Sequence, residues 1–169
     1  MSVKKVKSQM TIKEGEKLPQ ATLMEMVDGA PTPRSTEDFF GGKKVALFAV
    51  PGAFTPTCSA QHLPSFLQNH DALKAKGVNS IACVSVNDAF VMDAWGKSQD
   101  AGNKVHMLAD GNGEFTRAVG LELDASGFGM GERSQRYSMV VDNGVVIHLN
   151  VEAGGKYKVS SAEHMLEQL

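Results

Sequence analysis

The chain has 169 residues, 42% of them hydrophobic, and its 17 basic and 19 acidic side chains leave a net charge of −2. A chain of this size can bury the core of one domain, so we expect a single domain over residues 1–169. The charges are mixed along the chain, which argues against nucleic acid or an anionic lipid surface as a partner.

The N-terminal segment 1–10 is basic but is followed by no apolar run. No stretch approaches the ~20 apolar residues that cross a bilayer, so we expect no membrane partner and no export. The two cysteines, Cys58 and Cys83, are too few for a disulfide framework and favour a reducing compartment. We therefore expect a cytoplasmic location, with an organelle transit peptide already removed as the alternative.

The first predicted elements are a hairpin and a short helix. Short alternating patterns over residues 11–28 predict a small β-hairpin that decorates the fold. The turn residues of this region are Asp28, Gly29, Pro31 and Pro33. Ser35 offers an N-cap for a short helix that ends at Gly41-Gly42. Residues 43–50 then form a continuous apolar run, typical of a buried strand, which leads into PGAFTPTCS.

Strands and helices alternate in the middle of the chain. Helical spacing begins near Cys58 and ends near Gly77, and Pro64 inside it predicts a bend. The elements expected after it are a buried strand over 80–86, a cap at Asn87-Asp88, a helix over 90–99, a strand over 105–109 and a short helix ending at Gly120. This alternation predicts a parallel sheet with helices on both faces.

The C-terminal part changes pattern. Residues 137–141 and 145–151 are strand-like and flank Asp142-Asn143-Gly144, a strong hairpin signal. Ser161 then opens a final helix. Together the elements predict an α/β, thioredoxin-like fold with a central mixed sheet flanked by helices and an N-terminal β-hairpin extension.

Cys58 is the strongest candidate for chemistry. It falls at the start of a helix, where unpaired backbone N–H groups and the helix dipole stabilise a thiolate. Thr55 lies one turn earlier and its hydroxyl can donate or accept a hydrogen bond, while Pro51 and Pro56 fix the loop. A buried, inert Cys58 is the alternative, but a position between a buried strand and a helix start favours a reactive thiol.

Pro51, Thr55 and Cys58 match the P-x-x-x-T-x-x-C signature of the peroxiredoxins. The segments PGAFTPTCS, HLPSF, SVND, FVMDAW, LADG and RSQRYSMVVDNG resemble the type II, peroxiredoxin 5-like branch over essentially the whole chain. The resemblance implies that Cys58 attacks hydrogen peroxide or an organic hydroperoxide and becomes a sulfenic acid, without a metal or organic cofactor. Thr55 would orient the peroxide, Pro51 would shape the loop, and backbone amides around Thr57 and Cys58 would stabilise charge.

The resemblance also assigns an arginine to the site. Arg136, at the start of the strand RYSMVV, matches the arginine expected to hold the thiolate and the peroxide together. The resemblance thus places the substrate on Thr55, Thr57, Cys58 and Arg136. Arg133 is the rival, although an odd spacing along extended chain would turn the two arginines to opposite faces.

The second half of the redox cycle needs another thiol. Cys83 lies in the apolar strand SIACVSV and is expected to be buried and inert. Relatives that carry their own resolving cysteine have it in the segment that reads here KVSS, where this chain has Ser160. The resemblance therefore implies a one-cysteine mechanism in which glutathione, glutaredoxin or thioredoxin reduces Cys58.

Several alternatives stay open. Cys58 could act as a peroxide sensor read by a partner, or in thiol–disulfide exchange. His62, four residues after Cys58, could pair with it in a metal site or a cysteine hydrolase, but no further ligands or orienting carboxylate are evident. Phe128 and Met130, in the glycine-rich segment SGFGMGER, could form an apolar wall of the site, a homodimer contact or simple loop packing. A phosphate loop there is weak, because the glycines precede a strand.

Overall fold

The computed structural model describes residues 11–169. Segment 1–10, one basis of the expectation of no export, lies outside the described residues. None of the helices over residues 11–169 is both long and apolar enough to cross a bilayer.

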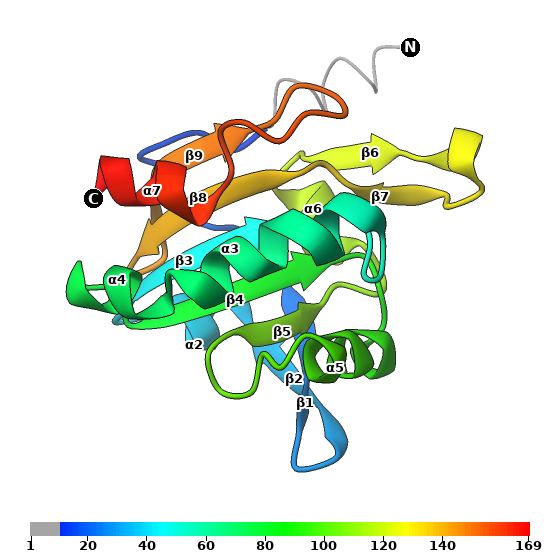
Figure 1. The fold of residues 1–169 in the computed structure, drawn as a ribbon, viewed down its shortest axis with the longest axis horizontal. Coiled ribbons are helices and arrows are strands. Elements are labelled where there is room, and N and C mark those ends of the chain that lie inside the picture. Colours follow the sequence, from blue (N-terminus) through cyan, green and yellow to red (C-terminus); the bar gives the residue numbers. More distant parts are fainter. Residues whose placement is uncertain (1–10) are drawn as a thin grey trace.

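Within residues 11–169, a seven-stranded mixed sheet forms the centre of the fold, in the order β2-β1-β5-β4-β3-β8-β9 (Figure 1). Its strands are β1 (Thr22–Val27), β2 (Ala30–Ser35), β3 (Lys44–Ala49), β4 (Ser80–Ser85), β5 (His106–Ala109), β8 (Tyr137–Asp142) and β9 (Val145–Val151). Strands β3, β4 and β5 are parallel, whereas β8 pairs antiparallel with β3 and β9. The predicted mixed sheet is confirmed.

Helices cover both faces of this sheet, as predicted. They are α2 (Thr36–Phe40), η1 (Cys58–His62), α3 (Leu63–Gln68), α4 (His70–Ala75), α5 (Ala89–Ser98), α6 (Glu114–Ala118) and α7 (Ala162–Gln168). Alternate β3 side chains point to opposite faces, so Leu47 packs in the core with α2 and α6, and Phe48 in the core with α3, α5 and α7. In Figure 1, α3 and α4 lie across β3 and β4 on the near face.

The N-terminal hairpin is present, but its arms are shifted from the prediction. Asp28 and Gly29 form the turn, with φ of 51° and 80°. Pro31 and Pro33 are strand residues of β2 rather than turn residues. Strand β2 is at the edge of the sheet, where a missing N–H can face away from the partner strand, and this explains why two prolines are tolerated.

The segment after Gly120 also differs from the prediction. We expected a loop there, but β6 (Glu122–Asp124) and β7 (Glu132–Ser134) pair in a two-stranded sheet with a helical turn, η2 (Ser126–Phe128), between them. Strands of three residues are too short to show an alternating pattern. The C-terminal hairpin and final helix are confirmed: Asn143 and Gly144 have φ of 49° and 80°, and Ser161 caps α7 through the His164 N–H.

Candidate active site

Cys58 lies beyond the carboxyl end of β3, in the first turn of a helix. Residues 56 and 57 are already helical, and η1 continues them as a π-helical segment closed by the Leu63 N–H on the Cys58 carbonyl. This widened turn directly precedes Pro64, which has no N–H and whose ring is incompatible with a regular α-helical ladder. Next to Pro64, where we predict a bend, the structure has a wide helical turn that begins at Cys58; the bend itself stays a prediction.

Two donors converge on the Cys58 sulfur, which belongs to a fully buried residue. Sγ lies 2.8 Å from Thr55 Oγ1 and 3.1 Å from Arg136 Nη2. Thr55 Oγ1 is also 2.7 Å from the Gly52 carbonyl. A hydroxyl has one proton, so Thr55 can donate to a Cys58 thiolate, or accept from a thiol while donating to Gly52. The site thus accommodates both protonation states of the sulfur.

Arg136 uses the other arm of its guanidinium on His62. Nη1 lies 2.9 Å from His62 Nδ1, and His62 Nε2 lies 2.8 Å from the Ser160 carbonyl oxygen. Arginine can only donate, so Nδ1 accepts and Nε2 carries the proton that is donated to Ser160. Burial, and then the charge of Arg136, lower the pKa of His62 to about 3. His62 is therefore a neutral acceptor that orients the guanidinium beside Cys58.

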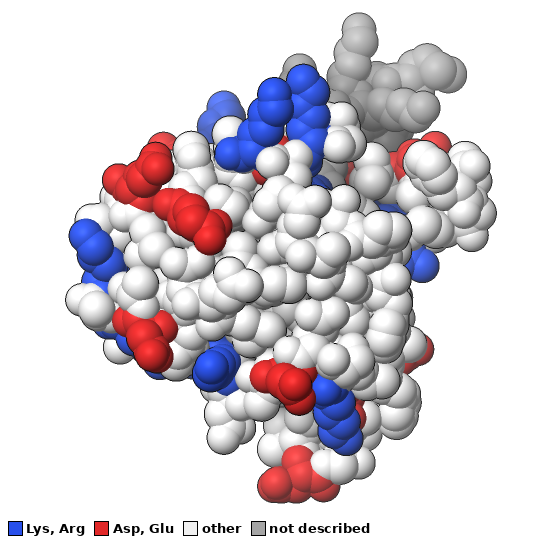
Figure 2. All heavy atoms as spheres, viewed as in Figure 1, with Lys and Arg blue, Asp and Glu red and all other residues white. Residues whose placement is uncertain are grey.

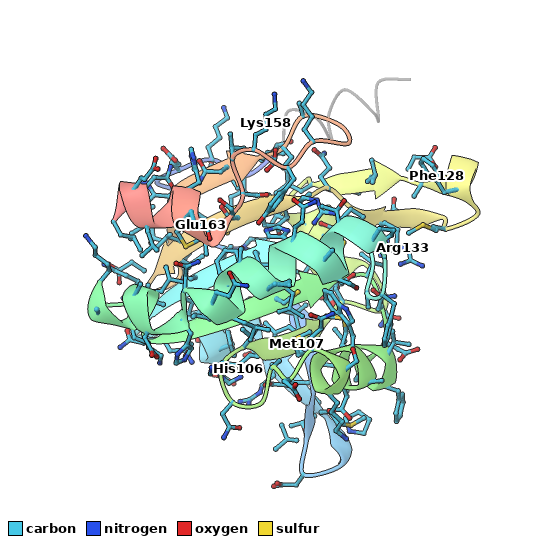
Figure 3. The ribbon with its side chains drawn as sticks, in the orientation of Figure 1. His106, Met107, Phe128, Arg133, Lys158 and Glu163 are labelled. Atoms are coloured by element: carbon cyan, nitrogen blue, oxygen red, sulfur yellow. The ribbon has the colours of Figure 1, made fainter. Side chains whose placement is uncertain are left out.

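Arg133 also reaches the active-site loop, but not the sulfur. Its Nε donates to the Met130 carbonyl at 3.0 Å, and its Nη1 donates to the Pro51 carbonyl at 3.4 Å (Figure 3). The expectation that the two arginines face opposite sides is wrong, because β7 ends at Ser134 and β8 begins at Tyr137, which leaves Arg136 outside both strands. Both arginines therefore contact the segment 51–58: Arg133 contacts its backbone at Pro51, and Arg136 contacts the sulfur of Cys58.

Side chains that follow β4 and that lie on α5 hydrogen-bond to the segment around Cys58. The Ala53 N–H donates to Asn87 Oδ1 at 3.0 Å, and the Trp95 indole N–H donates to Ser59 Oγ at 3.0 Å. Asn87 was expected as part of a helix cap, but Asp88 alone caps α5 through the Val91 N–H, which frees Asn87 for the loop. The sequence SVND therefore serves two structural purposes.

A cavity of about 390 Å³ is lined by Thr57, the neighbour of Cys58 in the chain, and by Pro51 and Arg136. Its apolar lining includes Leu123, Ala125, Phe128 and Met130. Gln135, Glu152 and Lys156 add polar groups to the lining. Phe128 is 86% exposed and lies in η2, the helical turn that connects β6 and β7, where Figure 3 labels it. A small ligand that carries an apolar group can fit in this space.

Sequence reasoning missed Glu152, the first residue after β9. Its carboxylate accepts hydrogen bonds from the backbone N–H groups of Lys158, Val159 and Ser160, and from the Ser160 hydroxyl at 2.6 Å. Ser160, where the family resemblance implies a resolving cysteine in other members, is fully buried. A lone glutamate after a strand gives no signal in the sequence, because its partners are defined only by the fold.

The surroundings of Cys83 are different. It lies in β4 with no exposure, and burial, followed by the nearby charge of Cys58, raises the pKa of its thiol well above the ordinary value.

Across residues 11–169, no group of three or more His, Cys, Asp or Glu could share a metal ion. The surface charges in Figure 2 are of both signs, with wide uncharged areas between them over this face.

Comparisons with known proteins agree with the family resemblance of the sequence. A family profile described as Redoxin matches residues 13–166. The chain is 52% identical over 164 residues to "Peroxiredoxin-2E-2, chloroplastic" of Oryza sativa subsp. japonica, covering 94% of this chain and 73% of the relative. It is 48% identical over 163 residues to "Peroxiredoxin-2E, chloroplastic" of Arabidopsis thaliana, covering 94% and 70%. These two names contradict the cytoplasmic location expected from the sequence, which had no compartment signal in its favour beyond an absence.

Two solved structures are similar over nearly their whole length. Reduced Prx3 from Vibrio vulnificus in complex with H2O2 has a TM-score of 0.90 and 55% identity, covering 94% of this chain and 99% of that one. Peroxiredoxin 5 from Alvinella pompejana has a TM-score of 0.83 and 39% identity, covering 92% and 96%.

Proposed function

The chain belongs to the type II branch of the peroxiredoxin family, and from this premise we propose that Cys58 performs its peroxidase reaction. The protein is a thiol-dependent peroxidase. The observation that carries the assignment to Cys58 is the pair of donors on its sulfur, Thr55 at 2.8 Å and Arg136 at 3.1 Å.

In the proposed reaction the Cys58 thiolate attacks the terminal oxygen of a hydroperoxide. The S–O bond forms as the O–O bond breaks, and the sulfur is oxidised to a sulfenic acid. The other oxygen leaves as hydroxide or alkoxide and takes up the proton that the Cys58 thiol released, which gives water or alcohol. Arg136 stabilises the negative charge as it moves from sulfur to the leaving oxygen, and Thr55 donates to whichever atom carries more charge. Pro51 and Thr57, both in the cavity wall, shape the space for the peroxide.

We assign the reducing step to an external thiol: glutathione, glutaredoxin or thioredoxin. Ser160 cannot form a disulfide, and its hydroxyl is bonded to Glu152. Cys83 is buried in β4 and its thiol has a raised pKa, so it is a poor attacking group. An external thiol would attack as its thiolate, form a mixed disulfide with Cys58 and displace hydroxide, which the proton released by that thiol converts to water. A second thiol would then free Cys58 by exchange.

The test is sustained peroxide consumption by the purified protein with each reductant in turn. Glutathione with glutaredoxin, and thioredoxin with its reductase, are supplied separately, and Cys58 is followed by mass spectrometry after one equivalent of hydroperoxide. We expect a sulfenic acid at Cys58, a mixed disulfide when glutathione is present, and multiple turnovers. Oxidation of Cys83 before Cys58 would overturn the assignment, and a single oxidation without turnover by any thiol would indicate a sensor.

Exposed aromatic side chains near the site support a homodimer. Phe54, in the active-site loop, is 56% exposed, and Phe128, in the cavity wall, is 86% exposed. We propose that a second copy covers these two side chains, since large apolar groups exposed near a site can mark an interface. Analytical ultracentrifugation of the wild type and of Phe128→Ser tests this, with a weaker dimer expected for the variant.

For the compartment, the names of two relatives support a plastid, which organelle fractionation can check.

A further inference from the structure

Glu152 connects two parts of the chain that meet at the active site. Its backbone N–H donates to the Arg136 carbonyl at 3.0 Å, just beyond the β8–β9 ladder. Its carboxylate binds the segment 158–160, which leads into α7, and every one of these contacts is 2.9 Å or shorter. Glu152 is only 8% exposed, so water competes little for the carboxylate.

The segment that Glu152 holds makes the contacts that orient His62. The Ser160 carbonyl accepts the Nε2–H of His62 at 2.8 Å. The Tyr157 ring packs against the His62 ring edge to face, with 5.2 Å between centroids. Loosening this segment would therefore remove the acceptor that fixes the proton of His62 on Nε2.

The position of that proton decides whether Arg136 faces a hydrogen-bond acceptor or an N–H group on the His62 ring. With the proton on Nε2, Nδ1 accepts from Arg136 Nη1 at 2.9 Å, and Nη2 is directed at Cys58 Sγ at 3.1 Å. With the proton on Nδ1, two N–H groups would face each other, and the guanidinium would have to move away. Because the guanidinium is a rigid fork, moving one arm moves the arm that reaches the sulfur.

A carboxylate suits this position for a chemical reason. Three backbone N–H groups and one hydroxyl converge on it, and an ionised carboxylate accepts at both oxygens and donates nothing. Burial opposes ionisation, but the bonds from Ser160, Lys158 and Val159 together hold the pKa of Glu152 below its ordinary value. A glutamine would point an NH2 group at some of the same donors.

We propose that Glu152 is a positioning residue for the peroxidase reaction: by holding residues 158–160 it fixes the Ser160 carbonyl, the His62 tautomer and the direction of the Arg136 guanidinium toward Cys58. The proposal rests on the function proposed for Cys58. It also gives Ser160 a role in this chain, which is to complete the set of donors around Glu152.

The experiment compares Glu152→Gln with Glu163→Gln. Both remove one negative charge from the C-terminal region, but Glu163 is exposed on α7 and its carboxylate binds Asn69. Single-turnover oxidation of Cys58 by H2O2 is measured from pH 5 to pH 9, together with the rate of Cys58 alkylation by iodoacetamide. We expect Glu152→Gln to slow oxidation about 10- to 100-fold, as misplaced catalytic groups do, and to move the midpoint of alkylation to higher pH. Glu163→Gln should match the wild type.

A spectroscopic readout separates positioning from general loosening. Nitrogen NMR of histidine-labelled protein should report His62 with its proton on Nε2 in the wild type and in Glu163→Gln, and a mixture of tautomers in Glu152→Gln. Ser160→Ala removes one donor to Glu152 but keeps the carbonyl, so it should give a smaller loss of rate. It serves as the test if Glu152→Gln does not fold.

The proposal is overturned if folded Glu152→Gln oxidises at the wild-type rate with an unchanged alkylation midpoint and His62 tautomer. If Glu152→Gln does not fold, wild-type rate and midpoint in Ser160→Ala have the same meaning. Failure of the proposed function is distinguishable, because Cys58→Ser would then keep its peroxide reactivity whatever Glu152→Gln does.

Discussion

Cys58 and Cys83 are both fully buried, yet their surroundings are opposite. Cys58 lies in the first turn of a helix with the Thr55 hydroxyl and the Arg136 guanidinium within 3.1 Å of its sulfur. Cys83 lies in the middle of β4, and burial raises the pKa of its thiol. In our proposal, the donors around the sulfur, and not its exposure, therefore distinguish the reacting cysteine from the other one.

The largest expected effect comes from exchanging each sulfur for oxygen. Cys58→Ser should abolish peroxide turnover, because a serine hydroxyl does not ionise at neutral pH and so provides no nucleophile comparable to a thiolate. Cys83→Ser should keep most of it, since Cys83 lies outside the proposed reaction. Peroxide consumption with a saturating thiol reductant measures both. Loss of turnover in folded Cys83→Ser would make Cys83 a resolving thiol and erase the contrast.

The two arginines sharpen the comparison next. Arg136→Lys should slow Cys58 oxidation about 10²- to 10³-fold, since an ammonium lacks the rigid planar fork that holds two donors in fixed directions toward Sγ and His62. Arg133→Lys is the matched control and should cost less than about tenfold, because Arg133 contacts only carbonyl groups. Stopped-flow oxidation rates decide between them, and a larger loss at Arg133 would reverse the assignment.

Thr55 should have the next largest effect. Thr55→Val keeps the shape of the side chain but removes the hydroxyl that lies 2.8 Å from Sγ. A hydrogen bond to a charged group contributes about 1.5–3 kcal/mol, so we expect oxidation to slow about 10- to 100-fold. Thr55→Ser restores the donor and should restore most of the rate. Equal rates for Thr55→Val and Thr55→Ser would show that the hydroxyl is not used.

The part of the site that is local in sequence could be predicted, and the part that depends on the fold could not. Thr55 and Cys58 are one helical turn apart, so spacing alone brings them together. Arg136 is 78 residues from Cys58 and was found only through the resemblance to a family. The role of Glu152 depends on a turn that folds back onto it, which no pattern in the sequence announces.

The same division holds for the fold. Long apolar strands and capped helices were predicted close to their observed bounds, because period and cap residues specify them. The prolines of β2 were assigned to a turn, since nothing local shows that a strand will lie at the edge of a sheet. Segments of three residues, such as β6 and β7, carry too little pattern to be recognised.

Stability in acid should depend on the Cys58 side of the comparison. The pKa of His62 is about 3 in the fold and about 6.5 in an unfolded chain. The unfolded state therefore binds a proton first, and stability falls as pH drops from 6.5 toward 3, by at most about 1.4 kcal/mol per pH unit from this group. Urea unfolding between pH 4 and 7 measures this slope. His62→Gln should flatten it, and an unchanged slope would mean that His62 is protonated in the fold.

Stability in alkali should depend on the Cys83 side. The fold raises the pKa of the Cys83 thiol, so the folded state keeps a proton that the unfolded chain begins to release near pH 8.5. Stability from this group is complete below that pH and falls as pH rises above it. Tyr137, whose pKa is also raised by burial, adds a similar loss only above about pH 10. Urea unfolding of the wild type and Cys83→Ser between pH 8 and 10 should therefore show a decline in the wild type that the variant lacks. If the stability of the wild type and of Cys83→Ser declined equally over this pH range, Cys83 would be ionised in the folded protein as well. The thiol of Cys83 would then not be kept neutral by burial, and this difference from Cys58 would disappear.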